Sequence, residues 1–144
     1  CQRLCEQHGF HQYEISNFAR VGHECRHNLK YWRDEEYLGI GPAAHSFYAG
    51  KRFAVPRDIE TFISSECQPA EITDDSPGDY DERVMMGLRL SEGIPEKLYK
   101  PFEEALRLIP QEYYRLEDGR LSLTGEGFPV YNYIVSLLLA HKEE

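Results

Sequence analysis

One stretch of the 144-residue chain, 13–46, most constrains what the chain can fold into. Residues 13–18 and 37–46 have the character of strands. Between them lies a loop in which polar, aromatic and imidazole side chains are far denser than a hydrophobic core requires. A polar, aromatic loop held by a rigid frame is the usual layout of a binding or catalytic site. The strongest candidates in the loop are Cys25, His27, Asn28, Tyr31 and Trp32.

The composition limits the kind of protein this is. Apolar residues make up 41% of the chain, enough for a core in one or two small units. The formal net charge of −9 argues against a nucleic-acid partner. The longest apolar run, 133–140, is too short to cross a bilayer, and no signal peptide is evident. Because the 4 cysteines have irregular spacing, we expect no disulfide framework and a reducing, cytoplasmic location.

Three motifs in this stretch resemble the HemN/HemW family of radical SAM proteins, and HemW more than HemN. They read Y-E-I-S-N-F-A from Tyr13, C-x-H-N-x-x-Y-W from Cys25 and Y-L-G-I-G-x-x-A-H-S from Tyr37. The rest of the chain resembles the C-terminal portion of that family. Since the chain opens on Cys1 without a methionine, we expect a fragment of a longer protein. The resemblance implies that the N-terminal part of the parent binds a [4Fe–4S] cluster and SAM.

The fold implied by the resemblance is α/β to α+β. Residues 1–66 would contain the last strands of a partial radical SAM (β/α) barrel, including the loop with H-N-x-x-Y-W. Residues 67–80, rich in proline, glycine and acidic side chains, read as a linker. Residues 81–144 would form a small winged-helix-like C-terminal domain. Because acidic side chains dominate this last segment, we favour docking over nucleic-acid binding for it.

Local patterns predict the individual elements. We expect a helix ended by Gly9, one strand over 12–18 and a hairpin through Ala49-Gly50. A short helix over 57–65 would turn Ile59, Phe62 and Ile63 inward. Further on, the patterns predict helices over 81–90 and 96–109, a hairpin at Asp118-Gly119, and a last helix that Thr124 caps and that buries Tyr131, Ile134, Val135 and Leu138.

The resemblance gives roles to the loop residues. His27 would be a candidate axial ligand or contact residue for haem, because imidazole is a common ligand of haem iron. Asn28 would orient its neighbours by hydrogen bonding. Tyr31 and Trp32 would offer flat faces to a porphyrin. On the residues alone an alternative stays open, in which the two aromatic rings close the end of a barrel and His27 caps a turn.

A second set of candidates would line a cavity for SAM and substrate. It comprises Glu14, Asn17, Gly39, Gly41 and His45. Glycines in a strand leave room for a ligand or for another strand, and the resemblance favours a ligand. Equally, Glu14 could be a structural carboxylate and His45 a hydrogen-bonded core residue. Position 43 holds alanine where many members of the family carry glycine, which matters if the backbone there needs a positive φ.

Two groups of cysteine and histidine could be taken for metal sites, and we favour neither. Cys1, Cys5 and His8 have the spacing of the radical SAM cluster motif with histidine in the last place, but the family's cluster loop lies far upstream of Y-E-I-S-N. His23, Cys25 and His27 alternate along the chain, and three ligands so placed converge poorly on a tetrahedral ion. No role is assigned to Cys67.

Three functions are compatible with these observations. The first is a haem chaperone of HemW type, which handles haem or porphyrin together with the N-terminal part of its own parent chain. The second is oxygen-independent coproporphyrinogen III oxidase, which decarboxylates its substrate oxidatively with SAM and a [4Fe–4S] cluster. The third is a docking module without a ligand. The H-N-x-x-Y-W motif favours the first over the second.

The fragment by itself should be inactive and should hold no cofactor tightly, because it lacks the three-cysteine motif. Strands that belong beside missing neighbours would leave open edges at 12–18 or 39–47. We therefore expect the fragment to form homo-oligomers.

Overall fold

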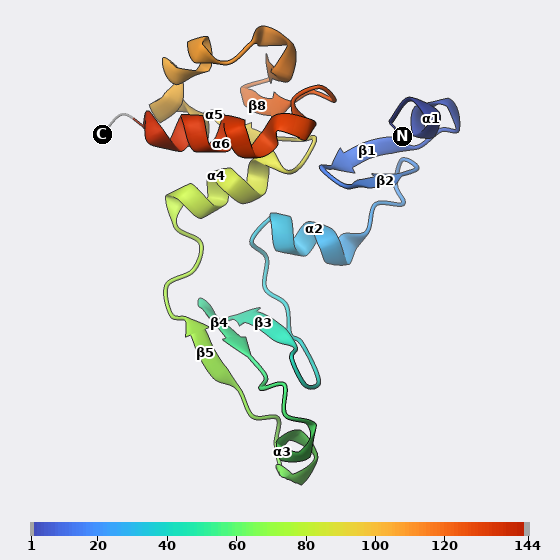
Figure 1. Ribbon diagram of the computed structural model, residues 1–144, viewed down its shortest axis with the longest axis vertical. Helices are drawn as coiled ribbons and strands as arrows, with labels where there is room; N and C mark the ends of the chain where they lie inside the picture. Colours follow the sequence, from blue (N-terminus) through green and yellow to red (C-terminus); the bar gives the residue numbers. More distant parts are fainter. Residues whose placement is uncertain (1, 143–144) are drawn as a thin grey trace. The chain divides into compact units, whose positions relative to one another are not determined.

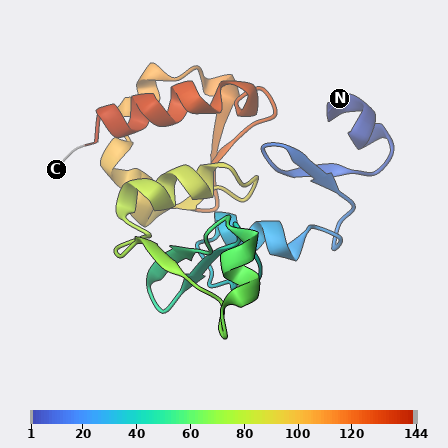
Figure 2. The same ribbon diagram turned by 60° about the horizontal axis from the view of Figure 1, so that its bottom comes forward.

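The computed structural model describes residues 2–142, which form two compact units. The first unit consists of Cys1–Arg33 together with Tyr80–Glu144, and the second consists of Asp34–Asp79. The second unit is therefore inserted between two segments of the first, as the path of the chain in Figures 1 and 2 shows. This division follows compactness, whereas the proposed boundaries 1–66, 67–80 and 81–144 follow the family; those boundaries stay a prediction.

The N-terminal segment of the first unit contains a helix, a hairpin and a second helix. They are α1 (Gln2–Gln7), β1 (His11–Glu14), β2 (Asn17–Ala19) and α2 (Arg26–Trp32). Gly9, at φ +79°, follows α1 and confirms the predicted helix end.

The prediction of one strand over 12–18 is wrong, because the chain reverses there. β1 and β2 pair antiparallel, with Gln12 opposite Phe18. The side chain of Glu14 accepts hydrogen bonds from the Ser16 amide at 2.5 Å and from Asn17 Nδ2 at 2.8 Å. These bonds close the turn, since side-chain oxygens that bind backbone groups two residues on stabilise reversals.

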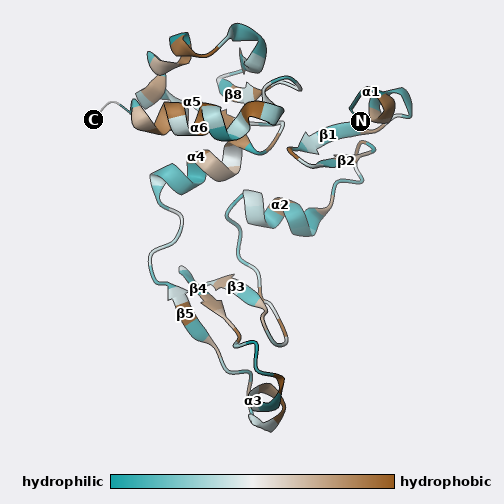
Figure 3. Ribbon diagram, viewed as in Figure 1, coloured by the Kyte–Doolittle hydropathy of each residue, from teal (hydrophilic) through white to brown (hydrophobic). Residues whose placement is uncertain are grey.

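The C-terminal segment of the first unit holds the main hydrophobic core. A three-stranded antiparallel sheet in the order β6-β8-β7 packs with helices. Apolar residues recur along these elements in Figure 3. The elements are α4 (Tyr80–Leu88), β6 (Ile94–Pro95), α5 (Glu96–Tyr99), β7 (Tyr114–Glu117), β8 (Arg120–Leu123) and α6 (Tyr131–Ala140), with short 3-10 helices at Lys100–Phe102, Ala105–Leu108, Gln111–Tyr113 and Phe128–Val130.

Most predictions for this segment are confirmed. The turn between β7 and β8 is Asp118-Gly119, and both residues have a positive φ. The predicted stripe of α6 is buried: Tyr131, Ile134, Val135 and Leu138. Thr124 caps an earlier turn than predicted, because its hydroxyl accepts from the Gly127 amide at 3.1 Å, ahead of the 3-10 helix that precedes α6.

The predicted continuous helix over 96–109 is wrong. α5 ends at Tyr99, and two 3-10 helices continue the chain. Pro101 lies at the break, and proline has no amide hydrogen to continue a helical ladder. Burial follows the predicted pattern nonetheless, since Phe102, Leu106 and Ile109 lie in the core.

The second unit is a small antiparallel sheet with one helix. It consists of β3 (His45–Tyr48), β4 (Lys51–Ala54), α3 (Ile59–Ser64) and β5 (Glu71–Asp74), in the sheet order β3-β4-β5. The predicted hairpin at Ala49-Gly50 is confirmed. The predicted strand over 37–46 is only a bridge between Tyr37 and Phe47 ahead of β3, and the predicted linker includes a strand, β5.

The prediction that α3 turns its apolar residues inward is wrong for two of the three, since Phe62 is half-buried. Ile59 is 61% exposed and Ile63 is 76% exposed. The Asp58 carboxylate caps the helix by accepting from the amides of Glu60 and Thr61. Every pairing between the described strands is antiparallel. Within residues 2–142 no helix is both long and apolar enough to cross a membrane.

Candidate functional site

The loop that the sequence singles out contains the helix α2. Leu29, Lys30 and Arg26 favour helix, and Cys25 precedes it in an extended conformation, at φ −68° and ψ 102°. The helix ends at Trp32, where the Arg33 amide still donates to Leu29 O at 2.9 Å. A helix brings residues four positions apart onto one face, so residues of the motif with this spacing lie next to each other on the surface of α2.

His27 and Tyr31 form one such pair on the outer face of α2. The imidazole Nε2 and the phenol oxygen are 2.8 Å apart, and the rings meet edge to face with centroids 4.9 Å apart. His27 is exposed and Tyr31 half-buried. The His27 imidazole is therefore accessible, but its Nε2 must leave the Tyr31 hydroxyl before it can bind a metal ion.

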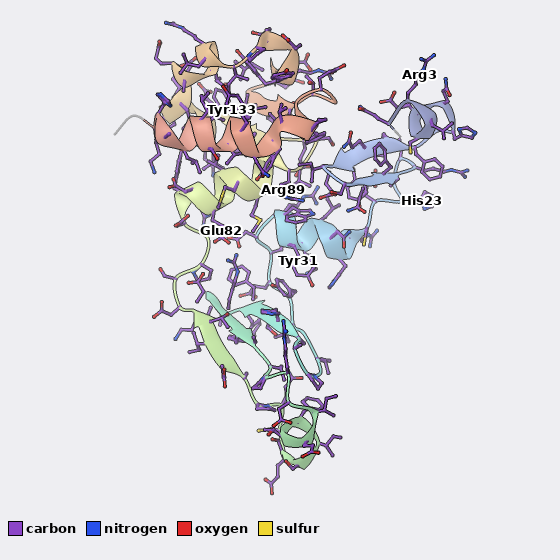
Figure 4. All side chains as sticks on the ribbon, in the orientation of Figure 1. Arg3, His23, Tyr31, Glu82, Arg89 and Tyr133 are labelled. Atoms are coloured by element: carbon purple, nitrogen blue, oxygen red, sulfur yellow. The ribbon has the colours of Figure 1, made fainter. Side chains whose placement is uncertain are left out.

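Trp32 lies one residue further on and faces Arg89. Arg89 directly follows α4 and is labelled, with Tyr31, in Figure 4. The guanidinium carbon of Arg89 is 4.1 Å from the centroid of the Trp32 ring. The indole Nε1 is buried and has no hydrogen-bond partner among the described groups. One face of the ring is thus already covered by a cation, which leaves at most the other face for a flat ligand.

Arg89 also lies close to Glu14 and Tyr131. Its Nη2 is 3.7 Å from Glu14 Oε2, and its guanidinium carbon is 5.6 Å from the centroid of the Tyr131 ring. The Tyr131 hydroxyl donates to Met85 O at 2.6 Å. Burial raises the pKa of the Tyr131 phenol, and the nearby positive charge of Arg89 opposes this in part.

Glu14 is fully buried, at 0% exposure, and is a structural carboxylate in the hairpin turn. Besides the bonds to Ser16 and Asn17, it faces the guanidinium of Arg89, so its buried charge has a counter-charge. Asn17 donates to Glu14, which brings these two predicted cavity residues together. Ser16 itself is exposed.

A polar cleft of about 190 Å³ lies beside β1 and α2. His11 Nε2 is 3.0 Å from Glu24 Oε1, and Arg33 donates two hydrogen bonds of 3.0 Å to Glu92. Hydrogen bonds from its own amide and from that of Gly22 hold the pKa of Glu24 below its usual range, and His11 adds to this effect. These pairs tie both ends of the loop to the rest of the first unit.

The remaining predicted cavity residues, Gly39, Gly41 and His45, belong to the second unit. A Cβ atom on Gly39 would lie 2.2 Å from the carbonyl oxygen of His45. The chain's own backbone therefore explains this glycine. Gly41 has φ +100°, which L side chains rarely adopt, and His45 is exposed on β3.

An apolar pocket of about 390 Å³ occurs in the second unit. Gly39 is the one member of the predicted set that lines it, next to Leu38, Ile40 and Phe53. His45 and Gly41 are not among its lining residues.

Neither cysteine and histidine group forms a metal site within residues 2–142, where no three His, Cys, Asp or Glu side chains gather. Cys25 is exposed and makes no capping bond to α2. Cys5 and Cys67 are free thiols. Cys1 lies outside the described residues.

Sequence reasoning missed the residues that hold the loop in place. Arg89 and Glu92 lie 57 and more positions beyond Trp32, so no local pattern connects them to α2. The sequence run that contains them, M-G-L-R-L-S-E-G, indicates a packed segment but does not indicate which part of the chain it contacts. What the sequence does indicate is the pairing of His27 with Tyr31, provided that the segment is a helix.

The chain is similar to several known proteins, although no family model matches it. It is 43% identical over 102 residues to the haem chaperone HemW of Synechocystis, covering 65% of this chain and 24% of that protein. It is 36% identical over 101 residues to the haem chaperone HemW of Bacillus subtilis, covering 65% of this chain and 26% of the relative. The chain thus spans about a quarter of the length of these relatives.

Its fold is similar to that of coproporphyrinogen III oxidase (HemN) from Escherichia coli, which is described as a radical SAM enzyme. The TM-score is 0.59 with 11% identity, over 94% of this chain and 38% of the other. At this identity the likeness concerns the fold, here mixed α and β with small sheets. The haem chaperone HemW of Mycobacterium tuberculosis H37Rv is 30% identical over 91% of this chain and 35% of that protein. With the relatives named above, it identifies the chain as a member of the HemN/HemW family of radical SAM proteins, corresponding to the C-terminal region.

Proposed function

We propose that this chain is the C-terminal, haem-handling region of a HemW-type haem chaperone. The similarity to proteins named haem chaperone HemW carries the proposal. The outer face of α2 supports it, because an exposed imidazole beside a half-buried phenol is suited to a tetrapyrrole. The ligands we propose are haem or porphyrin.

In the proposed arrangement His27 supplies the axial ligand and Tyr31 contacts the ring. Trp32 contributes the edge or the uncovered face of its indole, since Arg89 covers the other face. Asn28 and Cys25 flank the contact face at the start of α2. Glu14 and Asn17 support the site from the hairpin turn and do not touch the ligand.

The described residues do not fit an iron–sulfur cluster. The three-cysteine motif does not occur in the 144 residues, and no suitable group of ligands gathers among residues 2–142. The proposal therefore assigns SAM, the [4Fe–4S] cluster and the radical chemistry to the N-terminal part of the parent chain. Coproporphyrinogen oxidase activity has the weaker support, because the likeness to HemN extends only to the fold.

The finer description of the fold is likewise a proposal. Residues 1–66 would correspond to the end of the radical SAM barrel and residues 81–144 to a winged-helix-like domain, joined by 67–80. The order of α4, α5, the β7–β8 hairpin and α6 is in keeping with that domain. We also propose a cytoplasmic location.

The test is a haem titration of the purified chain followed at the Soret band. We expect His27→Ala to weaken haem binding by about tenfold or more and to change the band, because an axial ligand is lost. His141→Ala is the matched control: His141 is another exposed histidine, which directly follows α6 and whose Nδ1 lies 2.9 Å from Leu137 O. It should leave the titration unchanged.

Two results would count against this assignment. An unchanged Soret band in His27→Ala removes His27 from the haem site. A wild-type chain that gives no specific Soret change removes the haem-handling role of this region.

A further inference from the structure

The helix α2 is too short to hold its own position. It has 7 residues, no acidic side chain in its first turn, no capping bond from Cys25, and no residue that is fully buried. Isolated helices shorter than about 12–15 residues are marginal in water. The orientation of the His27–Tyr31 face must therefore come from tertiary contacts at the end of the helix.

Arg89 makes the contact with the last residue of α2. Its guanidinium carbon lies 4.1 Å from the centroid of the Trp32 ring, while its Nη2 faces the buried Glu14 carboxylate at 3.7 Å. The Arg89 side chain is only 26% exposed, so water weakens these interactions little. A planar guanidinium can stack on an aromatic face and meet a carboxylate with its edge.

The backbone around Arg89 holds the hairpin at the same time. The Ile15 amide donates to Arg89 O at 2.9 Å, and the Ser91 amide donates to Tyr13 O at 3.1 Å. Glu92, the residue after Ser91, accepts two hydrogen bonds from the guanidinium of Arg33, which directly follows α2. The segment 89–92 thus holds the Y-E-I-S hairpin and the H-N-x-x-Y-W helix together.

We propose that Arg89 is a positioning residue for the haem-contact face: by stacking on Trp32 and pairing with Glu14, it fixes α2 against the hairpin and so sets where His27 and Tyr31 point. This inference rests on the proposed function for its consequence in haem binding. The stacking contact itself can be tested without haem, because Trp32 is the only tryptophan in the chain.

The variant to use is Arg89→Met combined with Glu14→Gln. Removing Arg89 alone would leave the buried Glu14 carboxylate without a counter-charge, and the chain could then fail to fold. In the double variant both charges are absent, and the glutamine side chain that replaces Glu14 can still accept from the Ser16 amide. Arg89→Lys is the conservative variant, since it keeps the positive charge beside Glu14 and loses the planar stack.

In the double variant we expect the C-terminal core to keep its thermal midpoint to within about 4 °C, because its packing is apolar and Tyr131, the core residue beside Arg89, keeps its hydrogen bond to Met85 O. Acrylamide should quench Trp32 roughly twofold more strongly, because the indole loses its cover. Haem affinity should fall on the order of tenfold. Arg89→Lys should lie between the wild type and the double variant in both quenching and affinity.

The matched control is Lys142→Met, which also removes a cation above an aromatic ring, 4.7 Å from the centroid of Tyr80, and breaks an ion pair with Asp81. It should change neither quenching nor haem affinity. Unchanged quenching in the double variant overturns the contact. Raised quenching with unchanged haem affinity overturns the positioning role. A wild type without haem binding overturns the proposed function, and the quenching result then decides on the contact alone.

Discussion

Ala43 shows how a single backbone angle can limit the stability of the second unit. It lies in the left-handed region, at φ 63°, and its amide is 3.1 Å from Val55 O. An L side chain in this region costs about 1–2 kcal/mol, partly offset in a glycine variant by the greater entropy of its unfolded chain. Position 43 thus has the positive φ at which the replacement of the family's glycine by alanine matters.

We therefore expect Ala43→Gly to stabilise the second unit by roughly 0.5–1 kcal/mol. Hydrogen exchange of the Val55 amide, which donates to Ala44 O at 2.8 Å, reports on this locally. Ala44→Gly is the control, because residue 44 has no positive φ and a glycine there only adds entropy to the unfolded state. If exchange at Val55 becomes faster in Ala43→Gly, the left-handed angle is not what limits stability here.

At the scale of elements, the helix α3 depends on one carboxylate. The Asp58 carboxylate accepts hydrogen bonds from the amides of Glu60 and Thr61. It also accepts one from the Thr61 hydroxyl, with 2.6 Å between the two oxygens. The bonds from Thr61 hold the pKa of the Asp58 carboxyl below its usual range, with the Glu60 amide adding to them. Because the apolar residues Ile59 and Ile63 are exposed, little else holds this helix in place.

A depressed carboxyl pKa contributes stability that is present above the ordinary aspartate range and is lost as the pH falls through the lowered value. We expect the amides of α3 to lose protection from hydrogen exchange in that acidic window, once the intrinsic pH dependence is corrected. Asp58→Asn keeps a capping group that cannot titrate, so its protection should stay flat over the same window. An identical acid-induced loss in Asp58→Asn would assign the effect to another group.

The elements also show what a sequence can and cannot predict. The hairpin at Asp118-Gly119 and the stripe of α6 follow from local preferences and periodicity, which the fold obeys. The break at Pro101 could have been predicted from the missing amide hydrogen. The turn at 15–16 could not, because it depends on the buried Glu14 carboxylate, whose counter-charge comes from Arg89, 75 positions further along.

In the candidate site, too, some features follow from the local sequence and others depend on distant residues. Once α2 is a helix, the contact between His27 and Tyr31 follows from their spacing of four residues. The orientation of Trp32 does not, because it is set by a residue in another segment. A glycine in a strand pattern indicates a close ligand or a close strand at Gly39, and the structure identifies the neighbour as the backbone at His45.

At the scale of the whole molecule, the second unit exposes several large aliphatic side chains. They are Leu38, Ile40, Ile59, Ile63 and Ile72, each at least 59% exposed. Of the two strand regions proposed for self-association, 12–18 already pairs within the first unit, and Phe47 pairs with Tyr37. In the second unit the sheet order β3-β4-β5 leaves β5 as an edge strand, and its Ile72 is 59% exposed.

We expect the chain to self-associate at high concentration through the β5 edge. Light scattering after size exclusion should then show a molar mass that rises with protein concentration. Ile72→Lys should shift the onset to about tenfold higher concentration, because an edge charge must be desolvated on pairing. Leu116→Lys, a similar change at a 45% exposed position of β7 in the first unit, is the control. A mass that stays monomeric throughout, or an onset that Ile72→Lys leaves in place, contradicts this expectation.

The insertion of the second unit between Arg33 and Tyr80 has a consequence for synthesis. A ribosome makes the segment with the His27–Tyr31 pair before the insert, but the residue that fixes it, Arg89, emerges only after the whole insert. The nascent chain therefore passes through a stage in which the insert is complete while the contact face has no fixed orientation. Any cargo that needs this face must wait until the segment beyond the insert has left the exit tunnel.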